Sequence, residues 1–408
     1  MAAVAGGAAL FTTSGNGAVP PDIGPVSEMV VERLLTALVV CLDNLQKRGQ
    51  TGGQGRLKPS ISGTETTMVD HMLAVVCESP GRIALESRPM PLRGAGEVLI
   101  RIRRVGICGT DFHIYAGLHP FLAYPRLIGH ELSGTVEATP DGSRFTQGQI
   151  VAVNPYIACG ICHACRNAKP NCCMNIAVLG VHKDGGMCEY LAVPESNVLA
   201  VEGLSIDQAA TVEFLAIGAH AVRRAGAIKG LKALVIGAGP IGLATAVFAG
   251  IAGAEVTLAD RDVDRLTLAS SVVAAVETLS ADDHFAEAVM SVTSNAGFDV
   301  VFDATGNRAS MERGFGFVAH GGTYVFAGLI KDQITFSDPE FHRREVTLMA
   351  SRNATAQDFA HVIASIRAGL VPISGLLTHR TTLSTVAGDL PRWSDDKRGL
   401  IKALVEVA

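Results

Sequence analysis

Two hydrophobic patterns divide the chain into regions of different predicted structure. From Leu73 to about Ala200, short runs alternate apolar and polar residues, as in the EVLIRIR run that begins at Glu97 and the LSGTVEA run that begins at Leu132. Glycine and proline separate these runs, as they do in turns. Alternation of this kind predicts strands with one face in a core. We therefore expect an all-β-like first domain with long loops.

The pattern changes after Asp207, where helical stretches begin and short β-branched or aromatic runs recur between them. These runs begin at Leu234, Glu255, Asp299 and Gly322. Strands that alternate with helices predict a parallel sheet with both faces covered. Past Thr347 the pattern is mixed again, and we expect this last segment to pack back on the first domain.

Residues 1–70 differ from the rest of the chain in composition. Residues 1–27 are rich in Ala, Gly, Ser and Pro, and residues 50–63 form another polar, glycine-rich stretch. Both compositions are typical of disordered chain. Residues 28–48 fit an amphipathic helix, either a marginal or disordered surface segment or a docking helix, and its longest uncharged run, Leu34–Leu42, is too short to span a bilayer. We therefore expect a disordered extension and no membrane partner.

Composition narrows the class of protein further. With 408 residues, 48% of them hydrophobic and 18% charged, the chain is long enough for two well-packed domains. A formal net charge of −5 gives no basic field for a phosphate backbone, so we expect no nucleic-acid partner. The nine cysteines are an odd number, and five of them lie between Cys159 and Cys173. Metal ligation in a reducing compartment explains this clustering better than disulfides, and we expect a cytoplasmic protein.

A glycine motif, GAGPIG, lies between a predicted strand and an apolar helix. In such a motif Gly237 would make the tight turn, Gly239 would let the backbone approach a pyrophosphate, and Gly242 would allow close contact between helix and strand. Pro240 and Ile241 begin the helix, whose free N–H groups attract phosphate. An ordinary glycine turn is the alternative, but the position between strand and helix favours a dinucleotide site.

Asp260 ends the next predicted strand, about twenty residues after the glycine motif. Its carboxylate would accept hydrogen bonds from the adenosine ribose and repel the 2′-phosphate of NADP, so we expect NAD. Arg261 weakens this argument, because a guanidinium can pair with that phosphate, unless it is a solvated surface arginine. Two further segments follow strands at the edge where such sheets bind ligands. We expect these to line the cofactor: Thr305 and Gly306, and Gly328 and Leu329.

Four cysteines with the spacing C-x2-C-x2-C-x7-C predict a closed metal site. Four thiolates fill all four positions of a tetrahedral zinc ion, so a site of this kind stabilises structure. Cys172 adjoins the last cysteine and is an alternative ligand, although the spacing favours Cys173; free or disulfide-bonded thiols are the other alternative. The predicted ligands are Cys159, Cys162, Cys165 and Cys173.

A second candidate metal site has a mixed set of ligands. Cys108 lies in an ICGTDFH stretch, and His130 and Glu131 lie in a GHE stretch. A thiolate, an imidazole and a carboxylate leave one position of zinc open, as catalytic sites do. Taken singly, Cys108 could be a buried apolar residue, His130 a core histidine, and Glu131 a residue that orients a ligand. Together, and beside a dinucleotide motif, the three residues favour a metal site over these separate interpretations.

In their order along the chain, these motifs resemble those of the zinc-dependent medium-chain alcohol and polyol dehydrogenases. The motifs are GICGTDFH from Gly106, GHE, the four-cysteine lobe, DGG from Asp184 and the glycine fingerprint. The resemblance covers the chain from Leu73 to its C-terminus and points to the sorbitol and L-threonine dehydrogenase branch. The segments 213–224 and 351–353 resemble those of sugar-acid dehydrogenases that act on L-galactonate or L-gulonate.

The resemblance implies an α/β protein of two domains. A GroES-like, mainly β catalytic domain would comprise residues 71–215 and 353–408, with the structural zinc lobe at residues 155–175. A Rossmann-type, doubly wound parallel sheet would comprise residues 216–352. Two zinc ions per chain, NAD and a homodimer or homotetramer are also implied.

The resemblance assigns roles to matching positions. The catalytic zinc ligands would be Cys108, His130 and Glu131, with Glu213 binding the zinc or its water. Thr110 and His113 match a proton relay, and Arg352 matches a residue beside the substrate hydroxyls, although it could equally pair with a nearby acid. The expected reaction is the reversible oxidation of a secondary alcohol of a polyol or sugar acid. The alternatives are a threonine-type amino-alcohol dehydrogenase and a non-catalytic redox sensor that binds zinc and dinucleotide.

Overall fold

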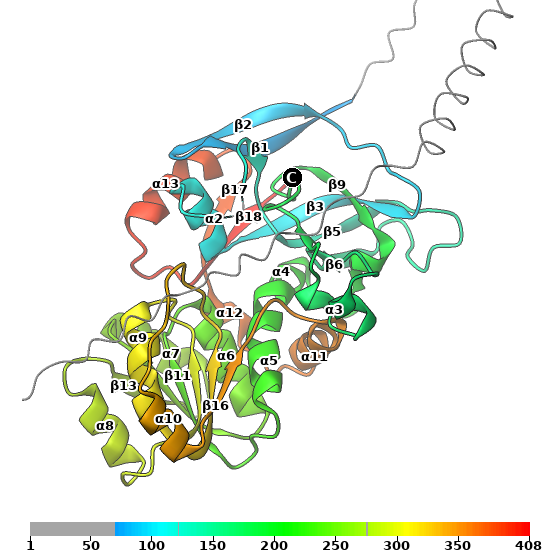
Figure 1. The fold of residues 1–408 in the computed structure, drawn as a ribbon. Coiled ribbons are helices and arrows are strands. Elements are labelled where there is room, and N and C mark those ends of the chain that lie inside the picture. The colour runs from blue at the N-terminus through cyan, green and yellow to red at the C-terminus, as the bar shows by residue number, and fades with distance from the viewer. Residues whose placement is uncertain (1–69, 121, 275) are drawn as a thin grey trace, which may run out of the picture. The chain divides into compact units, whose positions relative to one another are not determined.

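The computed structural model describes residues 70–408, except Phe121 and Ala275. The predicted N-terminal extension, with its helix at residues 28–48, lies outside the described residues. The described chain forms two lobes, each built around its own sheet (Figure 1). No helix in this part of the chain is long and apolar enough to cross a membrane.

The first lobe is mainly β, as the alternating pattern predicts. Its largest sheet has the order β10-β6-β5-β3-β18-β17, with β9 also paired to β3. These strands are β10 (Val198–Ala200), β6 (Ile150–Val153), β5 (Glu131–Ala138), β3 (Glu97–Ile107), β18 (Lys402–Glu406), β17 (Leu377–Thr382) and β9 (Tyr190–Pro194). Two small sheets complete it, formed by β2 (Arg82–Pro89), β1 (His71–Ser79) and β4 (Arg126–Leu127), and by β7 (Tyr156–Ile157) and β8 (Ala177–Val178).

Only the last part of the C-terminal segment, from Leu377 on, joins the sheet of this first lobe, whereas Thr347–Ala350 pairs within the sheet of the second lobe. Strand β18 pairs antiparallel with β3, and Leu404 lies opposite Gly106. In Figure 1 the red end of the chain accordingly lies beside the cyan strand β3. The short helices of this lobe are α2 (Gly109–Tyr115), α3 (His163–Arg166), α4 (Ile206–Ala210), α12 (Ile373–Leu376) and α13 (Val386–Asp395).

The second lobe contains a six-stranded parallel sheet. Its order is β13-β12-β11-β14-β15-β16, the doubly wound arrangement in which the chain reverses direction between β11 and β14. The strands are β11 (Lys232–Ile236), β12 (Glu255–Asp260), β13 (Glu277–Ser280), β14 (Phe298–Asp303), β15 (Val318–Phe326) and β16 (Thr347–Ala350). Ligands bind such sheets at the point of reversal, and the glycine motif follows β11 there. The α/β fold predicted from the sequence is confirmed.

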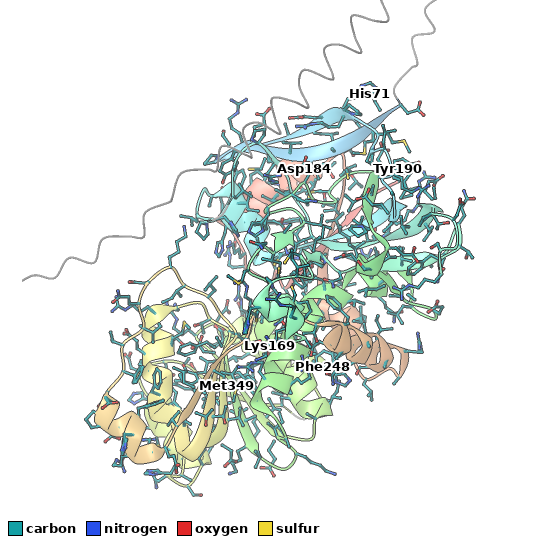
Figure 2. All side chains as sticks on the ribbon, turned by 45° about the vertical axis from the view of Figure 1, so that its right-hand side comes forward. His71, Lys169, Asp184, Tyr190, Phe248 and Met349 are labelled. Carbon is teal, nitrogen blue, oxygen red and sulfur yellow. The ribbon has the colours of Figure 1, made fainter. Side chains whose placement is uncertain are left out.

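Helices cover both faces of this sheet. They are α5 (Val212–Ala225), α6 (Pro240–Ile251), α7 (Val263–Val272), α8 (Phe285–Val292), α9 (Arg308–Gly314) and α10 (Asp338–Arg344). A further helix, α11 (Ala356–Arg367), packs against α5. Strand β11 shows why both faces are apolar: Val235 packs in a core shared with α5, α6 and α11, and Leu234 in a second core shared with α8. Figure 2 shows Phe248 and Met349 in this lobe and Tyr190 in the other.

Candidate functional site

Three adjacent strands bring the mixed ligand set together. Strand β3 ends at Ile107, directly before Cys108, while β5 begins at Glu131 and β18 begins at Lys402. Because β3 pairs with both β5 and β18, the ends of these segments meet at one edge of the sheet. Gly106 is opposite Glu131, and a Cβ at Gly106 would lie 2.0 Å from Glu131 Oε2. The glycine therefore makes room for the carboxylate.

Cys108, His130 and Glu131 form a group that fits a metal ion. Their ligand atoms all lie within 4.8 Å of one another, and two of the three residues are buried. A soft thiolate, an imidazole and a carboxylate are the donors that zinc accepts, and three protein ligands leave one tetrahedral position open. Chemistry and geometry therefore both fit a catalytic zinc site.

The surroundings of His130 are negative, as a cation site requires. Burial lowers the pKa of its ring, but the contact with Cys108 and the charges of Asp111 and Glu213 raise that pKa well above its usual value. His130 Nδ1 is buried without a hydrogen-bond partner, and so is one oxygen of Asp111. The other Asp111 oxygen accepts a 2.8 Å bond from the Cys108 N–H at the start of helix α2, which fixes the cysteine.

Glu213 lies near this group but outside the set of three. It begins helix α5, and its carboxylate accepts a very short hydrogen bond from the Tyr156 hydroxyl. Burial raises the pKa of Glu213 to about 6, the charge of His130 opposes that rise, and the charge of Glu131 adds to it. No sequence motif indicates Tyr156, because it lies 57 positions away from Glu213.

The predicted relay residues lie on helix α2. Thr110 Oγ1 is 3.7 Å from Cys108 Sγ, and His113 is exposed one turn further along the helix. Burial, followed by the charges of Lys397 and Lys331, lowers the pKa of His113. Its ring is therefore neutral near pH 7 and can accept a proton.

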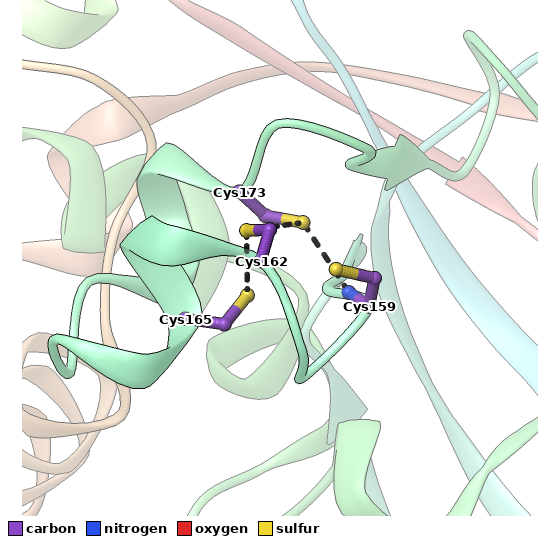
Figure 3. Close-up of side chains that lie close together, drawn as sticks. All are labelled: Cys159, Cys162, Cys165 and Cys173. Atoms are coloured by element: carbon purple, nitrogen blue, oxygen red, sulfur yellow. Dashed lines mark hydrogen bonds between the residues drawn. The ribbon is translucent and has the colours of Figure 1, made fainter.

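The four predicted cysteines of the second metal site converge, as Figure 3 shows. Their sulfur atoms all lie within 4.8 Å of one another, with Cys162 Sγ 3.5 Å from Cys165 Sγ and 3.9 Å from Cys173 Sγ. The backbone N–H of Met174 donates to Cys162 and helps to lower the pKa of that thiol to about 6. Cys172 is exposed and is not part of the group.

A buried polar network joins the cysteine lobe to the second lobe. Asn171 Nδ2 lies 3.3 Å from His220 Nε2 on α5, and His220 Nδ1 lies 2.9 Å from Asp358 Oδ2 on α11. Arg223 Nε lies 2.6 Å from the other Asp358 oxygen. His220 has no ligand-like spacing in the sequence and would have been taken for an ordinary surface or packing histidine, but it is a central member of this network.

The glycine motif has the backbone geometry of a nucleotide-binding turn. Gly237 adopts a φ of +103°, and a Cβ at Gly242 would lie 1.6 Å from Gly237 O, so a side chain fits neither position. The nearest atom to a Cβ at Gly239 would be a guanidinium nitrogen of Arg265 at 3.9 Å, which leaves room for a phosphate. Asp260 accepts a 2.6 Å bond from the Ala238 N–H and so fixes the turn.

A cavity of about 560 Å³ lies above this turn and extends to Gly109, next to Cys108. Six predicted cofactor residues line it: Gly237, Gly239, Asp260, Arg261, Thr305 and Gly306. Among the other lining residues are three with cationic side chains and one hydroxyl that no sequence motif indicated: Arg265, Arg313, Lys397 and Ser310. Arg265 lies only four positions after Arg261, so its place near the cofactor site could have been inferred, whereas Lys397 lies in a distant part of the chain.

The remaining predicted residues lie elsewhere. Pro240, Ile241 and Gly242 belong to helix α6, behind the turn, and Gly328 packs against Gly306, where a Cβ would lie 2.5 Å from the Gly306 nitrogen. Leu329 is 83% exposed. Arg352 is exposed, and its carbonyl oxygen accepts a hydrogen bond from Asn171. The pKa of His182 is lowered mainly by burial and further by the charge of Arg352. None of these six residues lines the 560 Å³ cavity.

Comparison with known proteins agrees with this site. Residues 94–203 match the alcohol dehydrogenase GroES-like domain, and residues 240–368 match the zinc-binding dehydrogenase family. The chain is 42% identical to L-galactonate-5-dehydrogenase of Escherichia coli K12 over 82% of this chain and 98% of that protein.

Solved structures agree as well. An alcohol dehydrogenase from Escherichia coli CFT073, crystallised with NADH, superimposes with a TM-score of 0.77 at 30% identity, over 82% of this chain and 99% of that one. L-idonate 5-dehydrogenase from Escherichia coli K-12 superimposes with a TM-score of 0.76 at 26% identity, over 83% and 98%. The chain therefore belongs to the zinc-type alcohol dehydrogenase family, and it is an oxidoreductase whose cofactors are zinc and a nicotinamide dinucleotide.

Proposed function

We propose that this enzyme oxidises a secondary alcohol of a sugar acid, in preference to a neutral polyol, to a ketone with NAD as the hydride acceptor. The observation that carries the proposal is the shared cavity, which reaches both Gly109, beside Cys108, and the glycine turn at Gly237. A substrate between them would contact the metal-ligand group and the nicotinamide together. Two zinc ions per chain are part of the proposal, one at each ligand group.

The residues of this chain would divide the work. Bound zinc would lower the pKa of the alcohol oxygen, and the nicotinamide would accept the hydride. Cys108, His130 and Glu131 would hold the ion. Thr110 would take the alcohol proton, and the neutral ring of His113 would pass it to solvent.

Positive groups around the site support an acidic substrate. Lys397 lines the cavity, and its charge and that of Lys331 act on His113, while those of Arg352 and Arg126 act on His182. A carboxylate entering this field would be attracted and paired, whereas a neutral polyol would gain nothing from it. Threonine carries an ammonium group as well as a carboxylate, so this field would give it no net attraction. The names of relatives that act on L-galactonate and L-idonate support the same substrate class.

NAD, rather than NADP, fits the end of strand β12. Asp260 accepts hydrogen bonds from the backbone N–H groups of Ala238 and Asp262, so its carboxylate is fixed beside the cavity. A 2′-phosphate there would meet this negative charge. Arg261 and Arg265 also line the cavity, and they are the groups that would favour NADP if Asp260 were replaced.

The test is turnover by metal-replete protein. NADH formation would be followed with L-galactonate, L-gulonate and L-idonate, with the matching neutral polyols and with L-threonine. We expect higher kcat/KM for an aldonate than for its polyol, and higher kcat/KM with NAD than with NADP. Turnover of threonine alone, or of no alcohol by folded protein, would refute the proposal. Lys397→Gln should lower the ratio of kcat/KM for an aldonate to kcat/KM for its polyol, because it removes a positive charge from the cavity.

A further inference from the structure

Lys402 is buried beside the mixed ligand set, and the proposed reaction gives it no role. Its side chain is 1% exposed, and that of Glu131 is fully buried. Lys402 Nζ lies 2.6 and 2.8 Å from the two Glu131 carboxylate oxygens and 3.1 Å from the Ile107 carbonyl oxygen. These three acceptors match the three N–H donors of an ammonium group. Nζ also lies 4.5 Å from the centre of the Phe214 ring.

Stability is a weak explanation for such a pair. Removing two charges from water costs several kcal/mol per ion, and a well-packed apolar pair is often as stable or more stable. The ion pair lies beside two candidate metal ligands: Glu131 directly follows His130, and strand β3 ends directly before Cys108. Its position therefore suggests a function at the metal site.

The contacts restrict what Glu131 can offer to a metal. A carboxylate has about four lone-pair sites, and Lys402 occupies one on each oxygen. The backbone of Gly106 closes the space beside Oε2, because a Cβ there would lie only 2.0 Å from that oxygen. Ligation through both oxygens would require Glu131 to leave the ammonium group.

We propose that Lys402 is a positioning residue that limits Glu131 to a weak, single-oxygen contact with the metal and so keeps one coordination position open for the alcohol. The charges agree with this role. The Lys402 ammonium lies among the negative charges of Glu131, Cys108 and Glu213. The inference builds on the proposed function, but it can be tested on metal binding alone.

The experiment replaces zinc by Co²⁺, whose visible absorption is strong in four-coordinate sites and weak in higher coordination. Protein with Cys108→Ala, which keeps the four-cysteine lobe, provides the spectrum to subtract. In Lys402→Met we expect Glu131 to bind through both oxygens. The absorption should then fall, a competing chelator should remove the ion roughly tenfold less readily, and kcat should fall about 10- to 100-fold. Lys402→Arg, which keeps charge and hydrogen bonds, should retain the wild-type spectrum.

An unchanged cobalt spectrum in Lys402→Met, or an ion held more weakly, would overturn the proposal and leave Lys402 a structural residue. If that variant does not fold, Lys402→Met combined with Glu131→Gln buries no charge and gives the test. The double variant should keep a four-coordinate spectrum with an affinity within about tenfold of wild type. Loss of its metal would show that Glu131 is a full ligand. Because no substrate is used, failure here is distinct from failure of the proposed reaction.

Discussion

The two candidate metal centres differ in where their ligands come from and in what surrounds them. In the cysteine lobe all four ligands come from one loop, and Cys159 and Cys173 are only 14 positions apart. In the mixed centre the ligands lie at the ends of paired strands, and Glu131 contacts a lysine 271 positions away. A local, all-thiolate loop closes around an ion, whereas a centre assembled from distant strands can leave a position open. A substitution in one centre should therefore leave metal binding at the other centre intact.

Cys108→Ala should have the largest effect, because it removes a ligand from the centre with the open position. We expect kcat to fall roughly 10³-fold or more, which corresponds to a loss of several kcal/mol of transition-state stabilisation. NAD binding should be retained, because the glycine turn lies in the other lobe. Turnover assays and titration of cofactor binding measure the two effects. Simultaneous loss of both, or loss of two zinc ions, would contradict the independence of the centres.

Cys165→Ser should mainly affect stability. Zinc contributes on the order of 10 kcal/mol to small isolated zinc peptides, and less where surrounding protein supports the loop. We expect the metal content to fall by one ion per chain and the Tm to fall by several degrees, with partial activity retained at low temperature. Metal analysis and thermal unfolding measure this.

Cys172→Ser is the matched control for that prediction. The residue adjoins a predicted ligand but is exposed and lies outside the group of four. We expect no change in metal content or Tm. Zinc loss in this variant would show that the lobe uses a different set of thiols.

The sequence predicted those parts of the fold and site that depend on local order. The parallel strands and the glycine turn follow from runs of neighbouring residues. Gly237 has the positive φ, and Gly242 the close backbone contact, that their motif requires. The convergence of the four cysteines could be predicted because all four lie within one short segment of the chain. The change of pattern after Thr347 predicted a return to the first lobe, but strand β16 still belongs to the second lobe's sheet and the return is made by β17 and β18.

The sequence could not predict contacts between distant segments. Nothing near Lys402 distinguishes it from a surface lysine, and its burial follows from the pairing of β18 with β3. Tyr156 reaches Glu213 across 57 positions, and His220 meets Asp358 across 138. Leu329 was expected at the cofactor because it follows a strand; its side chain is 83% exposed and does not line the 560 Å³ cavity, so its contact with the cofactor stays a prediction.

The last prediction concerns the polar network that joins the cysteine lobe to the second lobe. Burial raises the pKa of Asp358, but hydrogen bonds from Arg223 and His220 lower it far more, so the net pKa is well below the usual value. A depressed pKa means that the carboxylate stabilises the fold above about pH 4, its unfolded pKa, and that this contribution is lost on acidification. We expect Asp358→Asn to lower the free energy of unfolding by about 1.5–3 kcal/mol at pH 7.

The pH dependence distinguishes this ion pair from a packing effect. Denaturant unfolding at pH 7 and at successively lower pH should show the difference between wild type and Asp358→Asn shrinking below about pH 4. The control is Asp396→Asn, because Asp396 also pairs with an arginine, Arg398, but on the surface, where such pairs contribute little. If the Asp358→Asn deficit were constant with pH, or if Asp396→Asn matched it, the buried network would owe its stability to shape alone. The network between the cysteine lobe and the second lobe would then be held by packing rather than by charge. The cysteine lobe would differ further from the mixed centre, where Glu131 is paired with a buried lysine.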